Sequence, residues 1–255
     1  MEKKKYIILI GILILFFLVM FLLFGRDSLR KERQKLTIIV GDNTVWSYHN
    51  KKWSNVSSYD ELNWNKYIVY YNNEKKGNYY LWHDDKWYVF DNNKSALSFN
   101  GELLAYQSNE DLSITAFSVE DVLDDTSIFQ VLEEKDISSN NQFTSKYQVS
   151  FDIDGDGINV IFYVVSNAFA HSFNPDTIFS IVYMVKDNLI YPIYENISSN
   201  QGLNGCKPYF QSFLDVDQDN KYEFILSCGY YSNSRRSDML YRLTDEGFKI
   251  IVSNQ

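Results

Sequence analysis

Short apolar segments, separated by polar turns, recur along this chain at a nearly constant interval. The segment YHNKKWSNV at Tyr48 aligns with WHDDKWYVF at Trp82, an offset of 34 residues, and NKYIVYYNNEKKGNYYLW at Asn65 aligns with NGELLAYQSNEDLSITAF at Asn100, an offset of 35. These segments are rich in β-branched and aromatic residues, which favour pleated strands. Repeats of this length restrict the fold to stacked or ringed copies of one small strand unit.

Five such units can be traced between residues 36 and 255, which we predict to form one all-β domain. Four-stranded units that recur every 40–45 residues or so are typical of propeller blades, roughly the spacing seen here. The sequence therefore predicts a β-propeller-like fold of about five blades, complete or incomplete. Closure would hide edge strands that invite aggregation, and a stack of β-meanders that never closes is the alternative.

The last two units are the most regular. The fourth reads YQVSFD, NVIFYVVS, FSIVYMVKD and LIYPIYE, and the fifth reads YFQSFLD, YEFILSCGYY, DMLYRLTD and GFKIIVS. In the third unit, IFQVLEE at Ile128 is predicted as a closing strand. An acidic loop falls between the first and second strands of both the fourth and the fifth unit.

These two loops crowd carboxylates at alternate positions. One loop, DIDGDGINV, holds Asp152, Asp154 and Asp156, and the other, DVDQDNKYE, holds Asp215, Asp217, Asp219 and Glu223. Like charges at this spacing repel unless a cation or hydrogen-bond donors compensate, and Ca²⁺ takes about six to eight oxygen ligands in a tolerant geometry. An EF-hand is excluded, because Tyr163 and Leu226 stand at the twelfth positions, where a Glu is required. A solvated turn is the alternative for one loop alone, and the second copy favours a cation site.

The fourth and fifth units, roughly residues 147–253, resemble the FG-GAP or VCBS type of repeat found in integrin-like β-propellers. The resemblance implies structural Ca²⁺ held by side chains at the first, third, fifth and ninth loop positions and by the backbone carbonyl at the seventh. The implied ligands are Asp215, Asp217, Asp219, Glu223 and the carbonyl of Lys221 in one loop, and Asp152, Asp154, Asp156 and the carbonyl of Ile158 in the other. Val160 stands at the ninth position of the latter loop, so we expect weaker binding there or a recruited water. Gln218 and Asn220 replace the usual glycines, and Asn tolerates left-handed backbone angles better than most residues.

Residues 6–24, YIILIGILILFFLVMFLLF, contain no charged side chain. At about 1.5 Å per residue, a helix of this length matches the hydrocarbon core of a bilayer. We therefore predict residues 1–5 as a cytoplasmic tail, 6–24 as a transmembrane helix and 25–35 as a charged spacer before the β domain of residues 36–255. A cleaved signal peptide would have a shorter apolar region ending at small residues. Basic residues flank the helix on both sides and are more numerous after it, so the positive-inside rule alone would leave the domain in the cytoplasm. Calcium loops with few ligands instead favour an extracytoplasmic domain, where Ca²⁺ is abundant.

The charge of the β domain excludes one class of partner. The first 35 residues hold eight of the 24 basic and three of the 33 acidic side chains, which leaves 16 against 30 and a formal charge of −14 beyond them. Such a surface repels nucleic acid and anionic lipid. The two cysteines, Cys206 and Cys228, are compatible with a disulfide outside the cell and equally with free thiols.

The chain carries no G-x-S-x-G elbow, H-E-x-x-H motif or glycine-rich phosphate loop. His49 and His83 fall in repeated hairpin turns, which favours a structural role, and His171 stands alone in a loop. Blade-core packing is favoured over a sugar-stacking platform for Trp46, Trp53, Trp82 and Trp87. Arg235 and Arg236 form a lone basic spot that suits an anionic partner or an ordinary solvated turn.

Together these features predict a non-enzymatic, membrane-anchored extracytoplasmic module with structural Ca²⁺ loops, which binds another protein or a surface polysaccharide. A cell-envelope glycan hydrolase is one alternative, since two carboxylates about 5–10 Å apart are what such an enzyme needs. A structural subunit of a larger membrane complex is the other.

Overall fold

The computed structural model describes residues 35–108, 112–138, 142–169, 177–198, 205–230 and 236–254. The predicted tail, transmembrane helix and most of the spacer lie outside these residues, as do His171 and Arg235. Within the described parts of the chain, no helix is long and apolar enough to cross a membrane. Nearly all of the regular structure is β-strand, so the all-β prediction is confirmed.

The largest sheet, here called the N-terminal sheet, is antiparallel and runs in the order β3-β2-β1-β8-β4-β5-β6-β7. Its strands are β1 (Leu36–Val40), β2 (Thr44–His49), β3 (Lys52–Asn55), β4 (Lys66–Tyr71), β5 (Glu74–His83), β6 (Trp87–Phe90), β7 (Ala96–Leu97) and β8 (Leu103–Ser108), with a short 3-10 helix at Asp60–Leu62 before β4. The strands of the first two predicted units thus share one sheet with the start of the third. The link is β8, which pairs with β1 on one side and with β4 on the other.

The fourth and fifth predicted units each form a four-stranded antiparallel meander, as the sequence predicts. The outer sheet runs β10 (Val119–Glu120), β11 (Ser145–Phe151), β12 (Val160–Ser166), β13 (Ile178–Lys186), β14 (Leu189–Ser198), and the middle sheet runs β18 (Gly247–Ser253), β17 (Arg236–Thr244), β16 (Glu223–Tyr230), β15 (Cys206–Asp215), β9 (Ser113–Thr115). The segment LSITAFSVE of the third unit is divided between two sheets. Its first part forms β9 on the edge of the middle sheet, and its last part forms β10 on the edge of the outer sheet.

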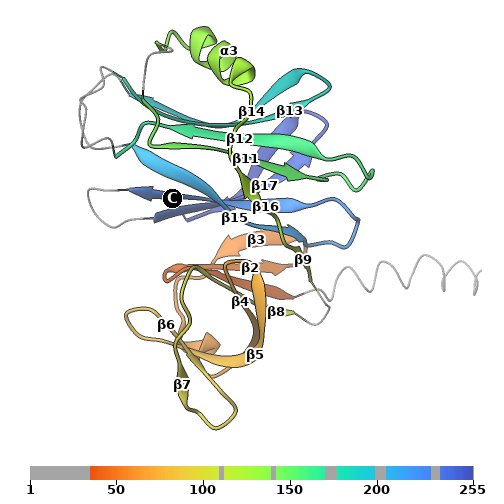
Figure 1. The fold of residues 1–255 in the computed structure, drawn as a ribbon. Helices are drawn as coiled ribbons and strands as arrows, with labels where there is room; N and C mark the ends of the chain where they lie inside the picture. The colour runs from red at the N-terminus through yellow and green to blue at the C-terminus, as the bar shows by residue number, and fades with distance from the viewer. Residues whose placement is uncertain are drawn as a thin grey trace, which may run out of the picture.

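The three sheets and one helix stack as successive layers. Figure 1 shows the N-terminal sheet at one end, then the middle sheet, the outer sheet, and helix α3 (Thr126–Glu134) on the far side. Phenylalanines fill the core between the middle and outer sheets, where the Phe151 and Phe213 rings stack 4.0 Å apart. Leu214 and Ile225, on the opposite face of the middle sheet, pack against Trp46 of the N-terminal sheet. The middle sheet is therefore buried on both faces, which explains the nearly unbroken apolar sequence of its strands.

The segment IFQVLEE, predicted as a strand, lies in helix α3 instead. Ile128, Val131 and Leu132 are its buried residues, and they follow the spacing of a single helix face. Asp124 accepts hydrogen bonds from the backbone N–H and the hydroxyl of Thr126, at 2.9 and 2.6 Å, which satisfies donors at the start of the helix. The strand prediction was wrong because Ile, Phe and Val favour strands locally, whereas the outer sheet offers an apolar face that a short helix covers.

Cys206 and Cys228 form a disulfide that joins β15 to β16. Their Cα atoms lie 5.4 Å apart, within the usual range for a disulfide, and both residues are buried in the core between the middle and outer sheets. The Tyr194 hydroxyl of β14 lies 3.0 Å from the Cys206 sulfur. The structure thus selects the bonded state from the two that the sequence left open.

A buried ionic network joins the middle sheet to the N-terminal sheet. Asp238 of β17 is 1% exposed and accepts hydrogen bonds from Arg236 Nε at 2.5 Å, Ser227 Oγ at 2.5 Å and Thr44 Oγ1 at 2.6 Å. The same guanidinium donates to Glu102, which precedes β8. Arg236 is therefore committed to partners inside the protein, and the solvated-turn interpretation was wrong for this residue.

We predict that Asp238→Ala lowers the free energy of unfolding by about 3 kcal/mol, because it removes the buried carboxylate that accepts from Arg236 Nε and from two hydroxyl groups. Urea unfolding of the full-length protein in detergent micelles, followed by tryptophan fluorescence, measures this loss. Glu246→Ala is the control, since Glu246 forms only an exposed ion pair with Lys249 and should cost less than about 1 kcal/mol. Equal losses in the two variants would contradict a structural role for the network.

Candidate metal centre: two aspartate loops in contact

The two acidic loops occupy the same place in two neighbouring sheets. One links β11 to β12 and the other links β15 to β16, as predicted from the sequence. The second residue of each loop, Ile153 in one and Val216 in the other, is fully buried. This apolar anchor fixes each loop to the core. Asp152 and Asp154, on either side of Ile153, are half-buried, whereas Asp215 before Val216 is buried and Asp217 after it is exposed.

The backbone turns in the same way in both loops. The fourth and sixth residues have left-handed φ angles, 70° at Gly155 and 85° at Gly157 in one loop, and 59° at Gln218 and 64° at Asn220 in the other. The expectation that the turn survives without glycine in the second loop is therefore confirmed. The cost of a left-handed side-chain residue is of order 1–2 kcal/mol, so the surrounding contacts hold this loop against local strain.

The first aspartate of each loop closes the turn through backbone hydrogen bonds. The two carboxylate oxygens of Asp152 accept the N–H groups of Gly155 and Gly157, both at 2.9 Å. Those of Asp215 accept the N–H groups of Asp219 and Asn220, both at 3.1 Å. The aspartate at the fifth position repeats the pattern in each loop, since Asp156 accepts from Ile158 at 2.7 Å and Asp219 accepts from Lys221 at 2.9 Å.

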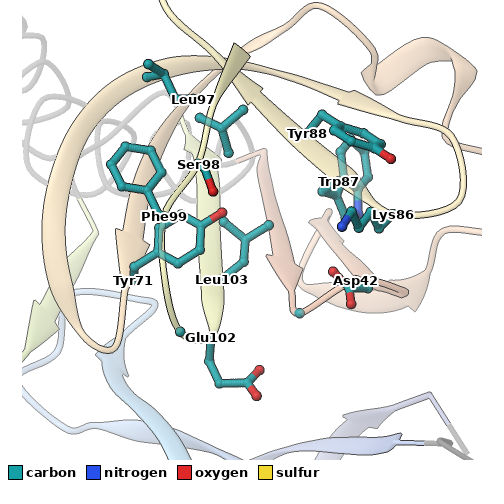
Figure 2. Close-up of a pocket in the computed structure, with 13 residues that line it drawn as sticks. Asp42, Tyr71, Lys86, Trp87, Tyr88, Leu97, Ser98, Phe99, Glu102 and Leu103 are labelled. Carbon is teal, nitrogen blue, oxygen red and sulfur yellow. The ribbon is translucent and has the colours of Figure 1, made fainter.

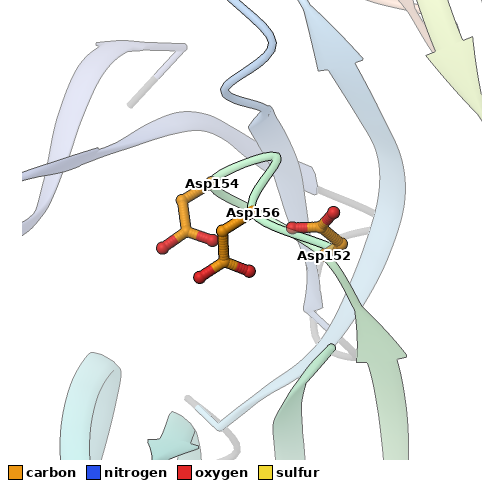
Figure 3. A group of neighbouring side chains, drawn as sticks. All are labelled: Asp152, Asp154 and Asp156. Atoms are coloured by element: carbon orange, nitrogen blue, oxygen red, sulfur yellow. The ribbon is translucent and has the colours of Figure 1, made fainter. Parts of the chain in front are cut away.

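Within each loop, three carboxylates converge. Asp152, Asp154 and Asp156 each offer one oxygen within 4.8 Å of the others, and Asp215, Asp217 and Asp219 do the same. Figure 3 shows the first group side by side along the turn. One oxygen of Asp154, Oδ1, is buried and has no hydrogen-bond partner among the described residues. Hard oxygen donors gathered in this way, one of them unsatisfied, fit the coordination preference of Ca²⁺.

A basic side chain reaches each loop from the third strand of the same sheet, a feature that sequence reasoning missed. Lys186 Nζ at the end of β13 lies 2.6 Å from Asp154 Oδ2 and 3.6 Å from Asp156 Oδ2. Its hydrogen bond lowers the pKa of Asp154 and raises that of Lys186. Arg242 of β17 lies 3.1 Å from Asp217 Oδ2 and 2.5 Å from Glu223 Oε1.

Lys186 and Arg242 occupy equivalent positions. Lys186 comes directly after Val185, which pairs with Ile161, the residue after the ninth position of the first loop. Arg242 comes directly after Tyr241, which pairs with Phe224, the residue after the ninth position of the second loop. A signal for them exists in the sequence, where MVKD and YRLTD both place a basic residue near the end of the third strand. That signal can be interpreted only once the pairing of the strands is known.

Glu223, the ninth residue of the second loop, faces inward. It is 2% exposed, with Oε1 2.6 Å from Arg242 Nε and Oε2 accepting the N–H of Val216 at 3.1 Å. Burial raises its pKa to about 7 although Arg242 opposes the shift. The structure does not include Glu223 in the converging group of three aspartates, so its ligand role stays a prediction. The carbonyl roles of Lys221 and Ile158 likewise stay predictions; both residues are exposed.

The two loops touch each other. The N–H of Tyr222 in the second loop donates to the carbonyl of Ile153 in the first, at 2.8 Å. A side chain at Gly155 would collide with the backbone carbonyl of Asn220, so glycine is required there by close approach as well as by its φ angle. The two aspartate triads thus lie on neighbouring loops that contact each other, at the joint between the middle and outer sheets.

Comparisons of this chain with protein-family models, with curated proteins and with solved structures find no match. The resemblance to calcium-binding propeller repeats therefore depends on the loop motifs themselves.

We predict that Gly155→Ala destabilises the protein markedly more than Gly157→Ala. Both glycines have left-handed φ angles, but a Cβ at Gly157 meets nothing within 4 Å whereas one at Gly155 meets the Asn220 carbonyl. Gly157→Ala should cost about 1–2 kcal/mol for the backbone angle alone. Urea unfolding of the two variants gives the difference, and equal losses would show that the loops do not touch in solution.

Proposed function

We propose that this protein is a membrane-anchored, extracytoplasmic binding module, with a β-propeller-like domain whose two aspartate loops hold structural Ca²⁺. The observation that carries the proposal is the pair of converging aspartate triads at equivalent places in adjacent sheets. Two independent solvated turns would have no reason to share positions, backbone angles and mutual contact.

Charge balance supports a divalent ion. In the first loop, three carboxylates stand against the single ammonium of Lys186. In the second, three aspartates and Glu223 stand against Arg242 and the exposed Lys221 of the loop itself. The basic side chains therefore offset part of the charge and leave a formal excess of two negative charges in each loop. A Ca²⁺ ion at each triad would supply the remainder, with Asp154 Oδ1 as one unsatisfied donor.

The extracytoplasmic location is supported by the disulfide. Buried disulfides persist in oxidising compartments and are rare in the cytosol, and few-ligand calcium loops suit the high Ca²⁺ concentration outside the cell. The anchor is the predicted transmembrane helix at residues 6–24. For the propeller-like architecture, the support is that the middle and outer sheets are blade-like meanders packed face to face.

The burial of Glu223 argues for ion binding over the hydrolase alternative. A general acid must reach the glycosidic oxygen of its substrate, whereas the carboxyl of Glu223 lies behind Arg242 and the Val216 backbone. Its raised pKa follows from that burial. A structural role in the loop explains both observations.

We predict that millimolar Ca²⁺ raises the melting temperature of the full-length protein in detergent micelles by about 5 °C over a chelator-treated sample. The double variant Asp154→Asn/Asp217→Asn should lose most of this shift, while Asp60→Asn, on the exposed 3-10 helix, should keep it. Differential scanning calorimetry gives all three values.

The variant Lys186→Met separates calcium binding from internal neutralisation. If Ca²⁺ and the lysine compete for the same carboxylates, the calcium-dependent shift grows when Lys186 is removed. If Lys186 alone neutralises the loop, the variant melts lower and Ca²⁺ has no effect, which would refute the metal proposal.

For topology, we predict that protease added to intact cells digests the β domain, and that Cys206 and Cys228 resist alkylation until a reductant is added. A domain that is protected until the cells are lysed, with both thiols alkylated directly after denaturation, would place it in the cytoplasm and overturn the extracytoplasmic proposal.

A further inference from the structure

The N-terminal sheet holds a pocket of about 410 Å³, separate from the aspartate loops. Figure 2 shows Trp87, Tyr88 and Lys86 on one side and Tyr71 and Phe99 on the other. Volumes of several hundred Å³ are typical of small-molecule sites, and such sites combine apolar walls with a few placed polar groups. This pocket has both.

The walls of the pocket are aromatic and supported from behind. Tyr71 is buried and packs 4.9 Å from the Phe99 ring, and Trp87, 4% exposed, packs 4.9 Å from the His83 ring. The indole nitrogen of Trp87 is buried and has no hydrogen-bond partner among the described residues. In Figure 2 the exposed Lys86 side chain lies beside it, so movement of that flexible chain would uncover an unsatisfied donor.

The rim is polar and held in place by backbone contacts. The N–H of Gly41 donates to the carbonyl of Leu103 at 2.8 Å, which fixes the turn that carries Asp42. On the other side, the side-chain oxygen of Asn72 accepts the N–H of Glu102 at 3.0 Å. The two carboxylates at the mouth are therefore carried by an ordered backbone, as a binding site requires.

The charges of the pocket balance. Among the lining side chains, Asp42 and Glu102 are acidic and Lys86 is basic, and Glu102 is already paired with the Arg236 guanidinium behind the rim. With Arg236 counted, the two carboxylates are matched by two basic groups, so neither a cationic nor an anionic ligand would find an unopposed charge. The pocket therefore suits a neutral ligand rich in hydroxyl groups.

We infer that this pocket binds a neutral pyranose sugar unit. The apolar C–H face of the ring would pack against Phe99 or Tyr88, the half-exposed aromatic side chains of the lining. Its hydroxyl groups would donate to the rim carboxylates and accept from Lys86 and the Trp87 indole. This inference rests on the proposed binding role and gives that role a ligand class, a surface polysaccharide.

The test is titration of the full-length protein, in lipid nanodiscs without glycosidic detergent, with maltotetraose, cellotetraose, chitotetraose and mannotetraose. Tryptophan fluorescence and isothermal titration calorimetry should detect saturable binding of at least one of the four. Phe99→Leu should weaken it about tenfold by removing an aromatic wall, and Trp87→Phe about fivefold by removing the N–H donor.

Phe90→Leu is the matched control, since Phe90 is also half-buried but packs on Trp64 outside the pocket. It should bind within about twofold of the original protein, and a melting scan of each variant shows that it is folded. Three results would overturn the inference: no saturable binding of any of the four probes, equal weakening by Phe99→Leu and Phe90→Leu, or binding of choline in place of the sugars. The rise in melting temperature with Ca²⁺ is measured separately. If that rise is seen but no sugar binds, the pocket inference alone is refuted. If a sugar binds but Ca²⁺ does not raise the melting temperature, the metal proposal alone is refuted.

Discussion

Burial of the middle sheet on both faces is the constraint on which the rest of the structure depends. A sheet enclosed in this way needs apolar side chains on both faces. Strand β15 has one residue more than its partner β16 at a β-bulge, which changes the face to which its side chains point. Its pairing with β16 shifts between Phe210 and Ser212, so Phe210 and Phe213, three apart in sequence, both enter the core shared with the outer sheet. Strict alternation would send them to opposite faces. The irregularity therefore makes the phenylalanine core possible, and Leu214 stays free to pack against the N-terminal sheet.

The sequence predicts the two C-terminal sheets well because their information is local. Each strand of β11–β14 and β15–β18 follows its predecessor as an antiparallel neighbour, so finding the strands also finds the sheet. The N-terminal sheet differs, because β8 pairs with β1 and β4, strands from two earlier units. The apolar pattern of LLAYQS does not indicate which strands pair with it, because β1, β4 and β8 are all short runs of mostly apolar residues. The units were visible in the sequence, and the way they share a sheet was not.

In the candidate site, too, the features within one segment could be predicted from the sequence, and those that depend on strand pairing could not. The aspartates, their spacing and their place between strands could be predicted, because the loop is one continuous segment of chain. Lys186 and Arg242 could not, since their approach depends on β13 and β17 lying beside the loops. The contact between Tyr222 and Ile153 depends on two sheets packing together. The pocket residues were also missed, because Asp42 lies in the turn between β1 and β2 whereas Phe99 lies in the connection from β7 to β8, two strands that do not pair. The packing interpretation of Trp87 does not predict that this residue lines a pocket.

The fixed cations change how the aspartate loops should be understood. A loop of uncompensated carboxylates would be unstable until metal arrived, and folding would then depend on the ion. Here Lys186 and Arg242 each offset part of the repulsion, so the loops can form without a metal, and the proposed Ca²⁺ would bind to loops that are already in place. The hydrogen bond from the Tyr222 N–H to the Ile153 carbonyl joins the two loops, so each loop supports the other in this form.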